Sequence, residues 1–309
     1  MHYEWLLEPD IRTVAGHHSA INKIKVVSAM TLHEAIQHRH SVRKYIDKPI
    51  EENLISILQE KVNEVNEKGE LHIQLVTNEP KAFKGKMAYG VFSGVSNYFA
   101  MIGKKADTLS ERIGYYGEQL VLLAETLGLN TCWVGLTYNK VKEAYEKGDD
   151  EKLCCMIALG YGDDPGRNMK RRPKQEQSGT CSDYALTSGS KRRLNTLDKY
   201  KMSEEEGGRT RVKRKSIEDV SNASDASAEL GTDATPKWFR DGVAAALLAP
   251  TAVNQQKFFF TYLGSNEDGI GMVKADRKFS LIGYTKMDLG IAKYHFELGA
   301  GKENFKWTE

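Results

Sequence analysis

Long apolar stretches are missing from this chain of 309 residues, and no run of about 18 apolar residues occurs in it. We therefore expect no membrane-spanning helix and no membrane partner. The N-terminal stretch MHYEWLLEPDIRTVAGHH has early acidic residues and no apolar segment, which argues against a signal peptide. There are only four cysteines, and none belongs to a CxxC pair. This argues against a disulfide framework or a zinc site and favours a cytoplasmic protein.

The sequence also lacks several motifs that mark common enzyme classes. GxxxxGK[ST], HExxH and GxSxG are absent, and neither Gly160-Tyr-Gly162 nor Gly299-Ala-Gly301 extends to GxGxxG. These absences argue against the usual nucleotide triphosphatases, zinc proteases, serine hydrolases and dinucleotide-binding enzymes. Hydrophobic residues make up 40% of the chain and charged residues 28%, which is typical of a globular protein and excludes disorder of the whole chain.

Positive charge is concentrated in one stretch although the formal net charge is only +2. Residues 167–215 hold 15 Lys and Arg against 6 Asp and Glu, and they show neither a helical nor a strand period. The small polar segment SNASDASAELGTDATP follows soon after. We interpret residues 167–235 as a largely disordered insertion or linker, because so long a structureless loop is unusual within one domain.

Periodic apolar patterns on both sides of this stretch predict helices and strands. Helices are expected from Thr31, which opens a capping box with Glu34, and over 51–68, 108–127, 238–249 and 286–301. Gly69 is expected to be the C-cap of the second helix. Strands are expected over 72–77, 153–162 and 257–264, and residues 131–137 read as a buried strand or loop. The helix near residue 114 and the one near residue 290 share a glycine-marked pattern, which points to two related halves.

The segment RHSVRKY contains two arginines, a histidine and a serine within five residues. Arg39, His40, Ser41 and Arg43 can converge on a phosphate dianion, with Arg as a bidentate donor and Ser as a hydroxyl donor. The alternative is a solvated basic helix end that the helix dipole stabilises.

Two further segments carry groups suited to a planar ring. In APTAVNQQKFFF a helix stops at Pro250, and the amides of Asn254 and its neighbours can both donate and accept, as the edge of a flavin or a base requires. In GLNTCWVGL, Trp133 can form the wall of a ring site. The alternatives are an ordinary polar turn and a plain core strand. The thiol of Cys132 has no evident base nearby, so we expect it to be buried and inert.

Together, these segments resemble the FMN-dependent nitroreductase family. AIQHRHSVRKY is similar to its N-terminal phosphate motif, GYYGEQLVLLAETLGLNTCWVG to its central helix and flavin-lining segment, and APTAVNQQKFFF to its Pro-Ser-x-x-Asn-x-Gln segment. In ordinary members the last segment comes soon after the first, FMN lies at a homodimer interface, and each subunit supplies one of the two motifs. Here the last segment arrives only near residue 250.

The resemblance therefore implies an α+β, nitroreductase-like fold of two tandem degenerate halves that form a pseudo-dimer. The expected parts are an N-terminal extension at 1–28, half one at 29–166, the insertion at 167–235 and half two at 236–309. A monomer suffices if half two replaces the partner subunit; otherwise a homodimer is needed. Half two has no segment like RHSVR, so only one flavin site is expected.

The resemblance also implies roles for individual residues. Arg39, His40, Ser41 and Arg43 would hold the FMN phosphate and ribityl chain. The residues near the flavin ring would be Trp133, Val134, Gly135, Pro250, Thr251, Ala252 and Asn254. A basic residue after half one would reach the phosphate, and Lys213 or Lys215 matches better than the alternative segment at 167–172.

The implied function is hydride transfer from NAD(P)H through flavin N5 to a nitroaromatic, a quinone or a similar small electron acceptor, with no catalytic acid or base from the protein. One alternative is a non-catalytic flavin-binding or sensor protein, which the degenerate second half motivates. Another is binding of nucleic acid or another anionic surface by the basic stretch. Only Tyr184 and Tyr200 interrupt that stretch, so a base-stacking platform is disfavoured and a solvated spacer preferred.

Overall fold

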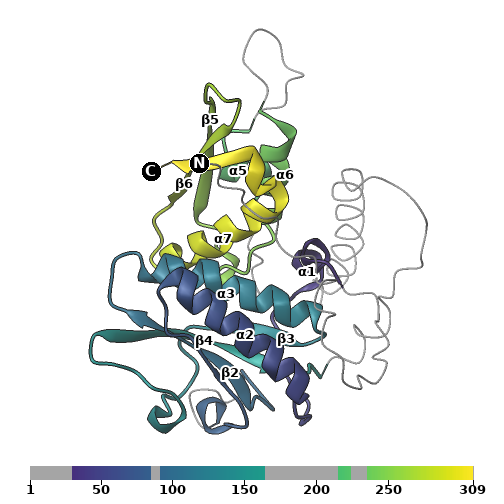
Figure 1. Ribbon diagram of the computed structural model, residues 1–309, viewed down its shortest axis with the longest axis vertical. Coiled ribbons are helices and arrows are strands. Elements are labelled where there is room, and N and C mark those ends of the chain that lie inside the picture. The colour runs from purple at the N-terminus through teal and green to yellow at the C-terminus, as the bar shows by residue number, and fades with distance from the viewer. Residues whose placement is uncertain (1–29, 85–90, 164–214, 224–234, 309) are drawn as a thin grey trace, which may run out of the picture.

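The computed structural model describes residues 30–84, 91–163, 215–223 and 235–308, and Figure 1 shows the two halves of the chain one above the other. Half one contains α1 (Leu32–His38), α2 (Glu52–Gly69), β1 (Gln74–Val76), β2 (Asn97–Lys104), α3 (Leu109–Thr126), β3 (Asn130–Val134) and β4 (Glu151–Gly160). Short 3-10 turns lie at Lys81–Phe83 (η2) and Lys142–Ala144 (η3). No helix in these described ranges is long and apolar enough to cross a membrane.

The sheet of half one is antiparallel, in the order β1-β2-β4-β3. Its central strand β2 is buried on both faces, because successive side chains of a strand point to opposite sides. Phe99 and Met101 join the core shared with the helices, whereas Tyr98 and Ile102 join a second core beneath the sheet. The four-residue opening TLHE of α1 forms the expected capping box, with Glu34 N–H donating to Thr31 Oγ1.

The end of α2 differs from the sequence expectation. Gly69 is the last helical residue, and the left-handed C-cap is Glu70 at φ 48°. A Cβ atom at position 69 would lie 2.6 Å from the ring of Tyr116 on α3. Glycine is needed here for close packing of α2 against α3 rather than for its backbone freedom.

Half two contains α6 (Lys237–Ala246), η4 (Ala252–Asn254), β5 (Phe258–Ser265), β6 (Gly271–Arg277), α7 (Thr285–Ala300), η5 (Lys302–Asn304) and β7 (Phe305–Thr308). Strand β6 pairs antiparallel with β5 and parallel with β7. The core of this half is aromatic: the ring of Phe296 stacks on Phe260 at 4.7 Å and meets the edges of Phe239 and Phe305. Helix α6 ends at Ala246, three residues earlier than expected, and the apolar residues 247–249 connect it to Pro250.

Helices α3 and α7 cross at two glycines and join the halves (Figure 1). A Cβ on Gly114 would collide with the carbonyl of Met287, and a Cβ on Gly290 would collide with the carbonyl of Glu111. The contact is reciprocal: residue 114 meets residues 287 and 291, and residue 290 meets residues 111 and 115. Such an exchange is what a twofold axis produces at a dimer interface.

Part of the expected linker belongs to half two. Residues 215–223 include the short helix α5 (Ile217–Val220), and Ser221 forms a β-bridge with Phe260. Asn222 exchanges hydrogen bonds with the backbone of Tyr262. The linker interpretation is therefore wrong for these nine residues; positions 164–214 and 224–234 lie outside the described residues.

Candidate functional site

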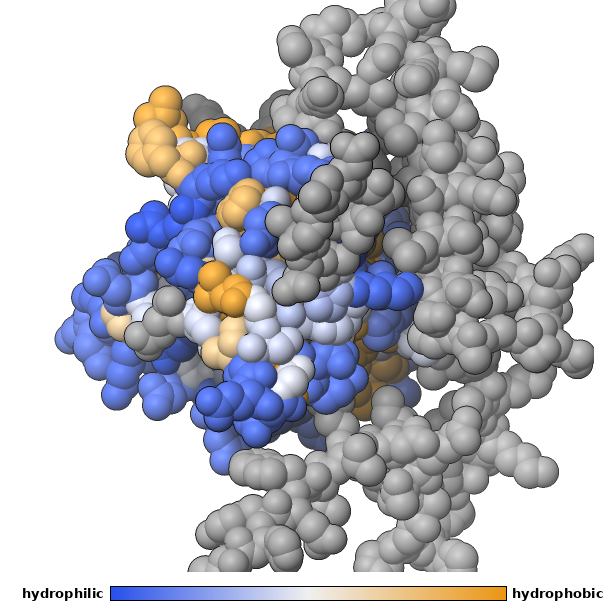
Figure 2. Space-filling view, turned by 90° about the horizontal axis from the view of Figure 1, so that it is seen from above, coloured by the Kyte–Doolittle hydropathy of each residue, from blue (hydrophilic) through white to orange (hydrophobic). Residues whose placement is uncertain are grey.

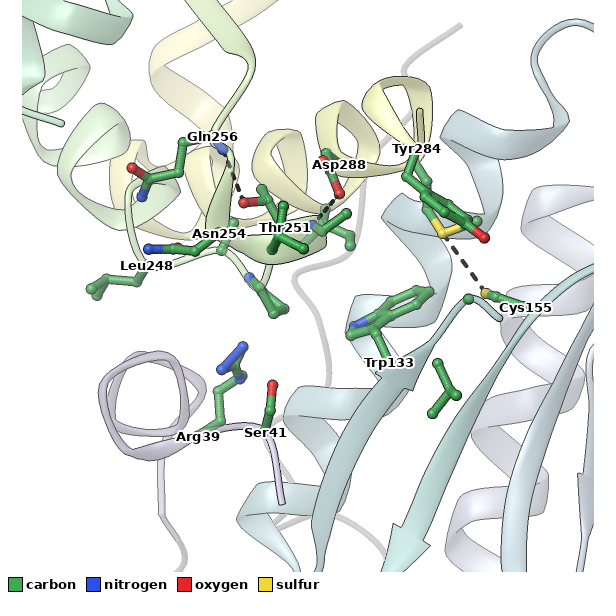
Figure 3. A pocket seen from close by; sticks show the side chains of 18 of the residues that line it. Arg39, Ser41, Trp133, Cys155, Leu248, Thr251, Asn254, Gln256, Tyr284 and Asp288 are labelled. Carbon is green, nitrogen blue, oxygen red and sulfur yellow. Dashed lines mark hydrogen bonds between the residues drawn. The ribbon is translucent and has the colours of Figure 1, made fainter. Parts of the chain in front are cut away.

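One cavity of about 670 Å³ lies between the halves. Its lower wall comes from the segment after α1 and from β3, and its upper wall from the segment between α6 and β5 and from α7 (Figure 3). The volume is in the range of ligand and cofactor sites. The cavity is therefore the place where the motifs of the two halves meet.

The lower wall carries Arg39, Ser41 and Arg43. Arg39 is the C-cap of α1, and a bridge from Ser41 to Thr131 fixes the following residues against β3. Figure 3 shows the Arg39 and Ser41 side chains directed toward the loop of Thr251 and Asn254. Nη1 of Arg39 is buried and has no hydrogen-bond partner in the described structure. A buried guanidinium donor without a partner is costly unless an anion fills the site.

The upper wall is a tight loop, Pro250–Gln256, with an unusual backbone. Val253, Asn254 and Gln256 all have positive φ, of 45°, 56° and 45°. Hydrogen bonds hold this shape: Gln256 N–H donates to Thr251 Oγ1 at 3.1 Å, and the Gln256 amide donates to the Leu247 carbonyl at 2.8 Å. Left-handed β-branched residues are rare and occur where the surrounding structure overrides local preference, as at binding sites.

Asp288, in the first turn of α7, supports this loop from behind. Its carboxylate accepts hydrogen bonds from Ala252 N–H at 2.9 Å and from the Gln255 amide at 2.7 Å. Burial nevertheless raises the pKa of Asp288 to about 6. The Gln255 amide also donates to the Gly283 carbonyl at 2.9 Å, which ties the loop to the segment before α7.

Trp133 of β3 forms the side of the cavity, and its orientation depends on buried partners. Its indole Nε1 donates to Glu118 of α3 at 2.9 Å. The other oxygen of Glu118 lies 2.9 Å from Nε2 of His295 on α7, and Nδ1 of His295 lies 3.2 Å from the Ala245 carbonyl of α6. The two ring nitrogens of His295 therefore link Glu118 of α3 to the end of α6.

The floor near Trp133 is closely packed. A Cβ on Gly135 would lie 2.6 Å from the Tyr284 hydroxyl, so glycine lets this phenol approach β3. The Cys155 thiol donates to the Met287 sulfur at 3.7 Å, and both residues line the cavity. Burial raises the pKa of Cys155 well above its ordinary value, which makes its thiol a poor nucleophile.

Lys215 brings a positive charge to the same cavity from the segment before α5. Its ammonium donates to the Gln256 carbonyl. Desolvation and the neighbouring charges of Lys257 and Lys278 lower the pKa of Lys215. An anion bound beside Lys215 would relieve that repulsion.

The structure places most of the residues expected at the flavin site around this cavity. Those that line it are Arg39, Ser41, Arg43, Trp133, Val134, Gly135, Lys215, Pro250, Thr251, Ala252 and Asn254. His40 is not among the lining residues, and its Nδ1 lies 3.4 Å from the His38 carbonyl. Lys213 lies outside the described residues. As expected, the Cys132 thiol is buried, and burial raises its pKa.

Sequence reasoning missed four supporting residues, which are Glu118, Tyr284, Asp288 and His295. Three of them, Glu118, Asp288 and His295, are ionisable residues on the buried faces of α3 and α7. An ionisable residue on the buried face of a helix needs a specific partner. The position of such residues within the apolar period could therefore have been recognised in both helix sequences.

Comparisons with known proteins bear on the family. The family model described as "Putative TM nitroreductase" matches residues 31–189 and 201–300. Among solved structures, a "putative nitroreductase" of Thermotoga maritima is 19% identical with a TM-score of 0.45, and the match covers 94% of this chain and 88% of that one. No curated protein matches the chain.

Two further structures match about half of the chain. An FMN-dependent nitroreductase of Clostridium difficile is 18% identical with a TM-score of 0.36, over 50% of this chain and 95% of that one. A "putative NADH oxidase" of Clostridium acetobutylicum is 15% identical with a TM-score of 0.36, over 50% and 98%. Since the family model spans most of the sequence, in two segments on either side of residue 195, the chain belongs to this nitroreductase family and has its fold.

Proposed function

We propose that this chain is an FMN-dependent oxidoreductase that passes a hydride from NAD(P)H to a nitroaromatic, a quinone or a similar electrophile. The observation that carries the proposal is the buried Nη1 of Arg39, which has no hydrogen-bond partner in the described part of the chain and lies at a cavity lined by both halves. Membership of the nitroreductase family supports the same assignment.

The residues present fit FMN. Arg39, Ser41, Arg43 and Lys215 offer the charged and hydroxyl donors that a phosphate needs. Trp133 offers an aromatic wall for a planar ring, and the Asn254 amide can both donate and accept at a ring edge. FMN, when bound, would supply the two-electron chemistry that these side chains lack.

The chain's own part in the reaction is binding and placement. Arg39 and Lys215 would anchor the anionic end of the cofactor, while Trp133 and the Pro250–Gln256 loop would hold the ring from both sides. The upper wall is fixed by Asp288 and the side wall by Glu118, so neither wall has to reorganise when ligands exchange. In this proposal no side chain acts as a catalytic acid or base.

One chain supplies both walls, so the functional unit in this proposal is a monomer that acts as a pseudo-dimer with a single FMN. Sedimentation of the FMN-loaded chain measures this directly. One FMN per chain in a monomer supports it, whereas cofactor binding only by a dimer contradicts it.

The test of the function is an anaerobic absorption spectrum of the purified full chain before and after addition of NADH or NADPH. Flavin bands that bleach and then return on addition of a quinone establish the oxidoreductase. Bands that neither nucleotide bleaches favour a non-catalytic flavin-binding protein. A chain that cannot be loaded with FMN overturns the proposal.

A further inference from the structure

Three exposed aliphatic side chains stand around the mouth of the cavity. Leu136 is 72% exposed, Val253 65% and Ile282 53%, yet all three line the cavity. Single exposed aliphatic residues are ordinary on protein surfaces. These three come from separate segments of both halves and meet at one opening, which we call the apolar rim.

The backbone of the rim is held in an unfavourable shape at Val253. Its φ of 45° and ψ of 26° lie in the left-handed region, where a β-branched residue is a genuine outlier. Folding thus keeps a strained backbone and also leaves an apolar side chain in water. Both features persist because Asp288 holds Ala252 N–H and Thr251 holds Gln256 N–H on either side of Val253. Strain of this kind collects at ligand sites.

Ile282 belongs to the segment between β6 and α7 and is linked to the Val253 loop. The Gln255 amide donates to the Gly283 carbonyl, so the two sides of the mouth are joined by a hydrogen bond of 2.9 Å. Gly283 and Tyr284 both have positive φ and form the turn that ends the segment. Phe279 and Leu281 of this segment are almost fully exposed, so apolar surface continues outward from the rim. Figure 2 shows apolar groups as separate islands in a mainly hydrophilic face, one of them protruding at its edge.

The interior of the cavity is therefore cationic and its mouth is apolar. Cationic donors of Arg39 and Lys215 lie inside, and the aliphatic rim surrounds the entrance. A ligand that uses both parts has a polar, reducible ring for the interior and an apolar substituent for the mouth. A nicotinamide dinucleotide gains little from contact with the rim, because the phosphates and riboses beside its ring are polar, so the aliphatic contacts favour the electron acceptor.

We infer that the apolar rim binds the substituent of the electron acceptor and that this chain reduces quinones carrying an alkyl chain. This inference rests on the proposed function. NAD(P)H gives two electrons and one proton as a hydride, and water supplies the second proton. The quinone gains two electrons and two protons and leaves as the hydroquinone, with NAD(P)⁺ as the other product.

The experiment compares 1,4-benzoquinones with linear alkyl substituents of increasing length, using the FMN-loaded full chain. We expect kcat/KM to rise about two-fold per methylene over the first several carbons. Complete burial of a methylene corresponds to about four-fold, and the rim is half open. Equilibrium binding without NAD(P)H, followed by quenching of tryptophan fluorescence, should show the same dependence on chain length.

The variant Val253→Asn tests the rim's contribution to acceptor binding without destabilising the fold. Asn tolerates the left-handed conformation better than Val, so the variant should unfold at an equal or higher temperature. It should nevertheless flatten the dependence on chain length, and Ile282→Ser and Leu136→Ser should do the same. The matched control is Leu263→Ser, which replaces an exposed aliphatic residue of β5 outside the cavity lining and should keep the wild-type slope.

Each negative result has its own meaning. The inference is overturned if kcat/KM of the active wild-type enzyme does not change with alkyl length, or if Val253→Asn shows the same dependence on alkyl length as the wild type. Either result leaves the proposed function standing. If the FMN-loaded chain is not reduced by NAD(P)H, the proposed function fails, and the binding series alone decides whether the rim takes alkyl chains. If the dependence of kcat/KM on alkyl length disappears at protein concentrations where the protein dimerises, the rim is a contact surface for a second copy. That result also overturns the inference.

Discussion

Glu118 and His295 are joined by a hydrogen bond of 2.9 Å in a place where neither residue has any exposed surface. The pair links α3 of half one to α7 of half two. Through its second oxygen Glu118 also holds Trp133, and through its second nitrogen His295 reaches the end of α6. A single buried pair therefore connects the side wall of the cavity with the helix that leads to the upper wall.

Replacing Glu118 by Leu should be severe. It leaves the Trp133 indole N–H and Nε2 of His295 without their buried partner, and the loss of one partner of a buried pair costs about 3–5 kcal/mol. Urea unfolding of the FMN-free chain measures the loss.

Glu118→Gln is the matched variant. Its amide oxygen can still accept from Trp133, and its amide nitrogen keeps a hydrogen-bonding group beside Nε2 of His295, so we expect a loss of about 1 kcal/mol. A loss as large as that of Glu118→Leu would show that charge, and not hydrogen bonding, holds the pair.

Arg39→Gln should weaken FMN binding without weakening the fold. A hydrogen bond to a charged group contributes about 1.5–3 kcal/mol, which corresponds to about 10- to 100-fold in the dissociation constant. The FMN-free variant should be as stable as the wild type, because Nη1 of Arg39 has no hydrogen-bond partner to lose among the described residues. Fluorescence titration with FMN gives the affinity, and the exposed Arg277→Gln serves as control. Equal FMN affinities in both variants would remove Arg39 from the phosphate site.

Stability should depend on pH through Asp288. Burial raises the pKa of its carboxyl from 3.8 to about 6, so the folded chain binds the proton more tightly than the unfolded chain. The free energy of unfolding should therefore fall by up to about 3 kcal/mol as the pH rises from about 4 to about 6. It should stay at the lower value above that pH. Asp288→Asn cannot titrate and should lack this component. Parallel urea titrations of both proteins between pH 4 and 8 test the difference, and identical pH profiles would contradict it.

The crossing of α3 and α7 should not tolerate a methyl group. Gly114→Ala and Gly290→Ala each place Cβ against a backbone carbonyl of the other helix, so we expect each to cost about 3 kcal/mol. The double variant should cost less than the sum, because one separation of the helices relieves both clashes. Thermal unfolding checks this. Gly148→Ala, beside the exposed Asp150, should change stability by about 0.5 kcal/mol or less.

Local chemistry made several elements predictable. The capping box of Thr31 and Glu34 marks the start of α1, and the 3.6-residue apolar periods give α2, α3 and α7. The alternating or continuous apolar runs give β1, β4 and β5. In the site, the arginine and serine of the first motif and the loop after Pro250 were found because their residue types suit phosphate and ring contacts.

Other features depend on contacts distant in sequence. Strand β7 is four residues long and pairs with β6 in parallel, so its short pattern carries little signal. Lys215 reaches the cavity only because Ser221 and Asn222 dock on β5. The left-handed φ of Val253 follows from bonds to Asp288 and Thr251, and a β-branched residue gives no local indication of it.

The two walls of the cavity come from one chain. This affects how the site can change by mutation and how the site depends on protein concentration. In a homodimer every substitution appears on both subunits, so the two symmetry-related sites cannot diverge from each other. Here each half can change alone, and residues of half two can adapt to the one cavity without altering half one. In the proposed monomer no subunit association has to precede assembly of the cavity, so we expect a very dilute chain to hold the same site as a concentrated one.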